Sequence, residues 1–160
     1  LLGSRRIGRH LEITMTNAPM KTPWHLWLIG VVALLFNAIG VFDFVMSMAQ
    51  GAKYQASAGM TPEQIAHYQG MPGWMTVVWA VGVFGAFAAS ILLLLRKKLA
   101  FVVFALSLAA FAVSLLYTYV LTNGGAVMGT QMAIASAVIA ALLVFFIGYS
   151  RFMTVRGVLR

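Results

Sequence analysis

The first long apolar run of the chain reads LWLIGVVALLFNAIGVFDFVMSM and covers residues 26–48. Three later runs, 74–95, 99–121 and 126–149, have the same character, and each of the four contains 22 to 24 residues. An α-helix rises about 1.5 Å per residue, and the hydrocarbon core of a bilayer is about 30 Å thick. About 20 apolar residues are therefore enough to cross it. The sequence predicts an all-α membrane protein with four transmembrane spans.

Composition and the lengths of the connections extend this prediction to a topology. Hydrophobic residues make up 62% of the 160 residues and charged residues 9%, far below the roughly 25% of charged residues in soluble domains. The connections 96–98 and 122–125 are so short that the spans they join must be antiparallel neighbours. We therefore expect one four-helix up-down-up-down transmembrane domain over 22–150, a cytoplasmic leader over 1–21 and a basic cytoplasmic tail over 151–160.

The basic residues predict the orientation of this domain. In a four-span chain, ten of the eleven Lys and Arg residues lie on one side of the membrane, and only Lys53 lies on the other. By the positive-inside rule, both termini are then cytoplasmic and the connections 49–73 and 122–125 face outward. The net charge of +8 does not indicate nucleic acid as a partner, because a binding face needs clustered basic and stacking aromatic side chains. The ten residues are Arg5, Arg6, Arg9, Lys21, Arg96, Lys97, Lys98, Arg151, Arg156 and Arg160.

The start of the chain needs a separate interpretation. The first residue is Leu1, and two methionines, Met15 and Met20, stand shortly before the first span. We expect part of the leader, residues 1–14, to be upstream read-through or a cloning remnant, with Met15 or Met20 as the true start. Without residues 1–14, seven basic residues remain on the cytoplasmic side, so the predicted orientation does not depend on them.

The longer outer connection contains the signature of a short helix. Thr61 is placed to cap the helix, Pro62 suits its first position, and Gln64 can complete a capping box. We expect this helix to end before Gly70 and to lie on the outer membrane surface. The alternative is a lid over the bundle. His67 on this helix is interpreted as an exposed polar residue, because no second ligand or base accompanies it.

Small residues at helical spacing predict where the spans approach each other. In lipid the hydrophobic effect adds little to helix association, so close contacts through small side chains carry much of it. We expect these residues to pack within one bundle, and dimerisation through one of the faces is the alternative. The residues are Gly40 on the first span, Gly82, Gly85, Ala86 and Ala89 on the second, and Gly129 and Ala133 on the fourth.

A polar stripe on the first span provides the candidate functional residues. At 100° per residue, its five members occupy roughly 140° of the helix. An acid within a span is costly and usually functional, although Asp43 lies only about 7 to 8 Å below the outer edge. Asp43 is either a hydrogen-bonded structural acid or a proton- or solute-binding group in an outward-facing cavity. The stripe consists of Asn37, Gly40, Asp43, Ser47 and Gln50, and the third span adds Ser107, Ser114 and Tyr117.

Asn37 lies near the middle of its span, where a bare amide would be poorly solvated. We expect it to hydrogen-bond to Ser90, Ser107 or Ser114 on a neighbouring span. Few residues of the chain could act as catalytic groups, because it has three acids, three histidines and no cysteine. These residues show no metal-ligand spacing and no nucleophile with a base, so we expect no enzyme, cofactor or metal site.

Several segments together resemble a known group of proteins. The likeness is carried by Trp24–Trp27, Leu35–Phe44, Thr61–Gln64, Pro72–Trp74 and Arg96–Lys98. The chain resembles small four-span bacterial inner-membrane proteins, mostly hypothetical and often named sugar transporters by automated annotation. The resemblance implies a bacterial inner membrane and carries no established mechanism. Phe44 departs from the group, in which a Tyr more often follows the Asp.

Two classes of function remain open on these grounds. The preferred class is a non-catalytic accessory, assembly or regulatory subunit whose small-residue faces bind a larger membrane complex. The alternative is an oligomeric transporter or channel, in which Asn37 and Asp43 line a path for a small polar, sugar-like solute or a proton. Four spans alone seldom enclose a solute pathway, so we expect the alternative to require a homo-oligomer.

Overall fold

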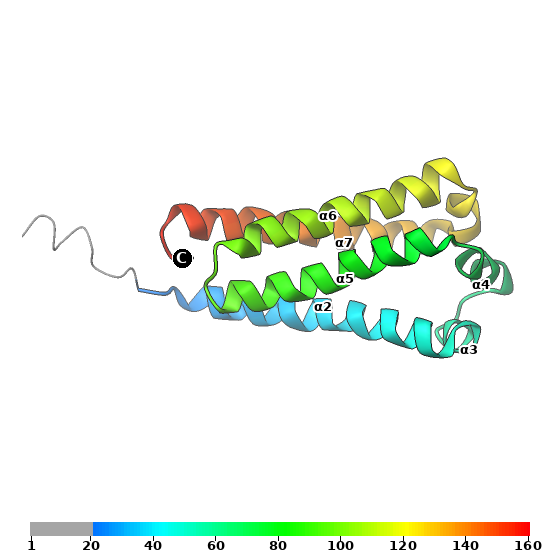
Figure 1. Ribbon diagram of the computed structural model, residues 1–160, viewed down its shortest axis with the longest axis horizontal. Coiled ribbons are helices and arrows are strands. Elements are labelled where there is room, and N and C mark those ends of the chain that lie inside the picture. Colours follow the sequence, from blue (N-terminus) through cyan, green and yellow to red (C-terminus); the bar gives the residue numbers. More distant parts are fainter. Residues whose placement is uncertain (1–20) are drawn as a thin grey trace, which may run out of the picture.

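The computed structural model describes residues 21–160 and contains four long helices that run antiparallel, side by side (Figure 1). All four are long and apolar enough to cross a membrane, and the described residues contain no strand. The prediction of an all-α four-helix membrane bundle is confirmed. Residues 1–20, which include most of the predicted leader, lie outside the described part. The long helices are α2 (Trp24–Gln50), α5 (Gly73–Leu94), α6 (Leu99–Leu116) and α7 (Gly124–Val155).

Three short elements lie at the end of the bundle where α2 ends and α5 begins (Figure 1). The predicted surface helix is α4 (Pro62–Gln69), and both hydrogen bonds of its capping box are present between Thr61 and Gln64. A second short helix, α3 (Ala52–Ser57), precedes it, and a π-helical turn, η1 (Tyr117–Leu121), extends α6. We call this end of the bundle, with α3 and α4, the loop end.

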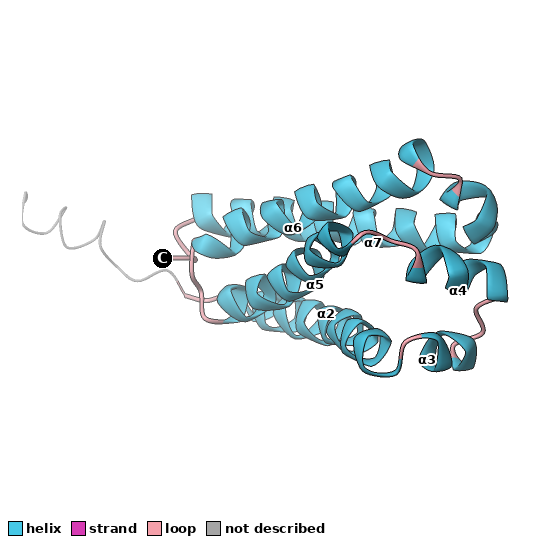
Figure 2. Cartoon of the chain, turned by 45° about the vertical axis from the view of Figure 1, so that its right-hand side comes forward, coloured by secondary structure: helices cyan, strands magenta, loops and turns pink. Residues whose placement is uncertain are grey.

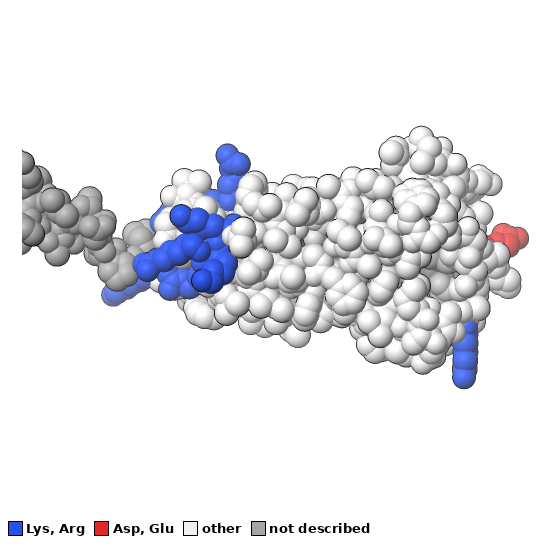
Figure 3. Space-filling model, viewed as in Figure 1, with Lys and Arg blue, Asp and Glu red and all other residues white. Residues whose placement is uncertain are grey.

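The opposite end, where the C-terminal residues lie, is the basic end. Lys and Arg side chains gather there, and the surface between the two ends is free of charged side chains in the view of Figure 3. Large apolar side chains are exposed along this middle zone, among them Leu35, Ile39 and Val144. Such a surface suits the acyl chains of a lipid bilayer, in which exposed apolar residues carry no solvation cost.

The basic end is closely packed. Phe104 and Phe146 stack with ring centroids 5.6 Å apart and are 0% and 2% exposed. The predicted tail takes part in this packing, because α7 continues to Val155 and the chain then turns at Gly157, whose φ is 71°. Val158 and Leu159 are buried as a result. Residues 151–160 are therefore helix and folded-back chain instead of a free tail.

Small residues bring α5 close to its neighbours. A Cβ built on Gly82 would lie 3.9 Å from the Cβ of Ala110 on α6, and one built on Gly85 would collide with the Ser107 hydroxyl. Ala86 and Ala89 are buried at the same interfaces. Gly40 on α2 faces Val83 of α5.

The other predicted packing residues, Gly129 and Ala133, do not pack inside the bundle. Both are exposed, and nothing lies within 4 Å of a Cβ built on Gly129. Gly129 instead has φ 72° and ψ −177°, a conformation that interrupts α7 and that is almost confined to glycine. Next to this break, the carbonyl oxygens of Val127 and Met128 accept hydrogen bonds from Nε2 of Gln64, both at 3.3 Å. The Gln64 side chain therefore caps α4 and also holds it against the break.

We predict that Gly129→Ala lowers the free energy of unfolding by about 1–3 kcal/mol, because alanine is strained at this φ and ψ. Gly148→Ala is the matched control, since Gly148 lies in regular helix on α7 with open space around its Cβ position. This control should be neutral or slightly stabilising. Unfolding of both variants in mixed SDS and detergent micelles, followed by circular dichroism, measures the difference. Equal stability of the two variants would contradict the break at Gly129.

Candidate functional site

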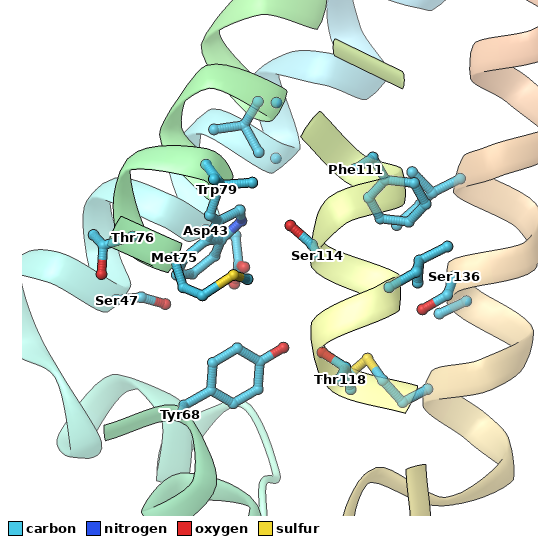
Figure 4. Close-up of a pocket in the computed structure, with 18 of the residues that line it drawn as sticks. Asp43, Ser47, Tyr68, Met75, Thr76, Trp79, Phe111, Ser114, Thr118 and Ser136 are labelled. Atoms are coloured by element: carbon cyan, nitrogen blue, oxygen red, sulfur yellow. The ribbon is translucent and has the colours of Figure 1, made fainter. Parts of the chain in front are cut away.

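The helices separate toward the loop end (Figure 2), and a partly enclosed cavity of about 830 Å³ lies there between α2 and α5 on one side and α6 and α7 on the other. Figure 4 places Asp43, Met75 and Tyr68 on one side of this cavity, opposite Ser114 and Thr118. We call it the loop-end cavity. Its lining includes residues of all four long helices and of both short helices.

Asp43 is the ionisable residue of the polar stripe. It lies on α2, is exposed, and lines the loop-end cavity. Its Oδ1 accepts a hydrogen bond of 3.0 Å from the hydroxyl of Tyr54 on α3. Gly51 makes this contact possible, because its φ of 54° turns the chain back after α2 at a value that favours glycine. The Tyr54 ring also meets Phe42 edge to face.

The charge of Asp43 affects two phenols of the short helices. The hydrogen bond to Asp43 is the main cause that raises the pKa of Tyr54 above its ordinary value. Desolvation raises the pKa of Tyr68 on α4, and the charge of Asp43 adds to this effect. Both hydroxyls therefore stay protonated at neutral pH. That of Tyr54 donates to Asp43, and that of Tyr68 remains a hydrogen-bond donor in the cavity lining.

Aromatic rings and thioethers form part of the remaining wall, beside aliphatic and small residues. The ring centroids of Tyr68 and Trp79 of α5, which both line the cavity, lie 6.1 Å apart, and Phe44, outside the lining, meets Trp79 edge to face at 4.9 Å. Phe44, where a Tyr was expected from the resemblance, thus packs on rings and has no need of a polar partner. Five of the ten methionines of the chain line the cavity: Met48, Met71, Met75, Met128 and Met132.

Asn37 forms the floor of the cavity and links two spans. Its Nδ2 donates to Oγ of Ser90 on α5 and to the carbonyl oxygen of Ala33, both at 2.9 Å. The Ser90 hydroxyl donates in turn to the carbonyl of Ala86 at 2.8 Å. Of the three partners considered from the sequence, Ser90 is the one that the structure brings to Asn37. With its amide used in this way, Asn37 acts in helix packing as well as in the lining.

The other candidates divide into two groups. Ser47, Ser107 and Ser114 line the cavity, whereas Gln50 and Tyr117 do not. Gln50 is the last residue of α2 and is exposed, and Gln55 of α3 is a glutamine of the lining instead.

Tyr117 lies outside the lining for a geometrical reason. At 100° per residue it lies about 80° from Ser107, whereas Thr118 lies within about 20° and does line the cavity. Tyr117 instead meets Trp74 edge to face at 5.6 Å. The same angular spacing, measured from Ser107 along the sequence, would have predicted Thr118 in place of Tyr117.

His67 differs from its predicted exposed position. Its Nε2 is buried and has no hydrogen-bond partner, and it lies beside Gly124, where α7 begins. Over residues 21–160 there is no group of three or more His, Cys, Asp or Glu residues that could hold a metal ion. His67 therefore belongs to the contact between α4 and α7.

We predict that Asp43→Asn lowers the pKa of Tyr54 toward its ordinary value of about 10. A raised pKa means that the hydrogen bond to Asp43 is complete below about pH 10 and is lost as the pH rises through the raised value. NMR titration of ¹³C-labelled tyrosine, assigned with Tyr54→Phe, measures the midpoint. Glu63→Gln, which removes an acid at the same end, should leave it unchanged. An unchanged midpoint in Asp43→Asn would contradict the contact.

No protein-family model, curated protein or solved structure gives a significant match to this chain. The resemblance to small bacterial inner-membrane proteins stays a prediction, as do the bacterial membrane and the position of the termini. Described by its fold, the chain is a four-helix integral membrane protein with a cavity at its loop end.

Proposed function

We propose that this protein binds a small organic molecule in the loop-end cavity, with Asp43 as the ionisable group of the site. The observation that carries the proposal is a cavity of about 830 Å³ within a single chain. Sites for small molecules commonly measure about 300–1,000 Å³ and combine apolar walls with a few polar groups. Under the predicted orientation, the ligand reaches the cavity from the outer side of the membrane.

The cavity favours the solute-binding class of function over the accessory class. The accessory role was preferred because four spans seldom enclose a solute pathway without an oligomer. A cavity formed by one chain supports a solute-binding role that needs no second copy.

The basic end bears on the kind of transport that such a role could serve. Below the floor at Asn37, the side chains of Leu93, Phe104 and Phe146 fill the bundle and are at most 2% exposed. A continuous pore is therefore absent from this part of the chain. A carrier that alternates between two conformations, or a membrane sensor, fits this arrangement better than an open channel.

An accessory or assembly role remains the second candidate. The observation that favours it is the face of α7 formed by Gly129, Ala133 and Ala137, which is exposed and unused within the bundle. Small residues in this spacing permit close approach of another transmembrane helix. A larger complex or a homo-oligomer would form through this face.

We predict that the cavity is accessible to water-soluble reagents. The chain has no cysteine, so Ser114→Cys introduces a single thiol at the cavity wall. In proteoliposomes, we expect this thiol to react with a membrane-impermeant methanethiosulfonate reagent, detected by mass spectrometry. Ser150→Cys is the matched control, because Ser150 is 0% exposed in the packed basic end. Failure of Ser114→Cys to react under conditions that label the denatured protein would refute the proposed function.

The second candidate makes a different prediction. If α7 binds another helix, Ala133→Leu should reduce the mass of the complex isolated in mild detergent, because leucine prevents close approach. Val144→Leu, at another exposed position of α7, should leave the mass unchanged. Light scattering combined with size-exclusion chromatography measures both variants. A wild-type protein that is already monomeric would remove this candidate.

A further inference from the structure

The loop-end cavity has an unbalanced charge. Asp43 is its only acidic lining residue, and no Lys, Arg or His side chain lines it. A carboxylate offers about four acceptor positions, and only the hydrogen bond from Tyr54 is present among the described side chains. In a cavity with a mainly apolar lining, an ionised carboxylate is stabilised by a positive charge brought close to it. The cavity is therefore electrostatically complementary to a cation.

The walls indicate what kind of cation fits. A metal ion would need several oxygen ligands at fixed geometry, and the described residues supply no cluster of that kind. The space of about 830 Å³ is also far larger than a bare ion requires. Trp79 and Tyr68 both line the cavity, and aromatic rings of this kind attract the alkyl groups around an ammonium centre through cation–π interactions. The five methionines provide a deformable apolar surface for the rest of the molecule.

We infer that the ligand of the loop-end cavity is a monovalent organic cation with an apolar body, held by Asp43 at its charge and by the Trp79 and Tyr68 rings. This inference rests on the proposed function and specifies its ligand class. Tyr54 acts as a positioning residue, since its hydroxyl fixes one oxygen of the Asp43 carboxylate. Anions are repelled from the same cavity, which contains no basic side chain.

The test compares probes that differ in charge and not in shape. Choline and its uncharged carbon isostere 3,3-dimethylbutan-1-ol form the matched pair, and benzyltrimethylammonium adds an aromatic body. With the full chain in nanodiscs of zwitterionic lipid, isothermal titration calorimetry should rank benzyltrimethylammonium above choline. The uncharged isostere should bind at least about tenfold more weakly than choline, which corresponds to about 1.4 kcal/mol. This comparison uses the wild-type protein and so does not depend on whether a variant folds.

Variants then locate the site. Asp43→Asn should weaken binding of benzyltrimethylammonium about tenfold or more, whereas Glu63→Gln removes an equal charge outside the lining and should leave it unchanged. Trp79→Leu should weaken the same binding, and Trp74→Leu, which alters a ring outside the lining, should not. Circular dichroism melts confirm that each variant is folded.

The possible outcomes distinguish failure of the cation inference from failure of the proposed small-molecule binding. Equal binding of choline and its uncharged isostere, or binding that Asp43→Asn leaves intact, would overturn the cation. Binding of a neutral sugar such as glucose, without binding of either cation, would also overturn the cation, and it would support the solute-binding role. If Ser114→Cys is labelled in proteoliposomes but no cation binds, the proposed function stands and the ligand class is wrong. If the thiol is inaccessible, both fail.

Discussion

Close approach of α5 to α2 and α6 is the contact on which the rest of the structure depends. In lipid, an apolar side chain gains little by leaving the acyl chains for a protein neighbour, so helices associate where small residues allow tight packing. Gly82 and Gly85 provide this on the α6 side, and the hydrogen bond between Asn37 and Ser90 adds a specific link to α2. This packing, together with the aromatic core at the basic end, leaves the loop end free to hold a cavity.

A cavity is also the setting in which an acid within a span is tolerable. A carboxylate facing lipid would lose its hydration without compensation. Asp43 instead lines the partly enclosed loop-end cavity, and its Oδ1 accepts a hydrogen bond from Tyr54. The hydrogen bond expected of a structural acid is therefore present, and the carboxylate keeps further acceptor positions, as the proposed binding role requires.

The sequence predicted those features that depend on local chemistry. Span length follows from bilayer thickness, and the start of α4 follows from Thr61 and Gln64, whose hydrogen bonds form within four residues of chain. The break at Gly129 could not be predicted, because a glycine within a span serves packing as often as irregular backbone. The cavity could not be predicted either, because it depends on how far the helices diverge. The contact of Tyr54 with Asp43 depends in turn on the backbone conformation at Gly51, where the chain turns back after α2.

The segment between α2 and α5 connects these features. Its first helix reaches Asp43 through Tyr54, and its second places Tyr68 in the cavity wall and holds the α7 break through Gln64. The segment was expected on the membrane surface, with a lid over the bundle as the alternative, and its residues Gln55 and Tyr68 line the loop-end cavity. Since one short segment contacts both the acid on α2 and the interruption of α7, these two unusual features of the bundle are linked through α3 and α4. Among residues 21–160, α7 is the long helix whose backbone is interrupted by non-helical φ and ψ, and a helix bends most readily at such an interruption.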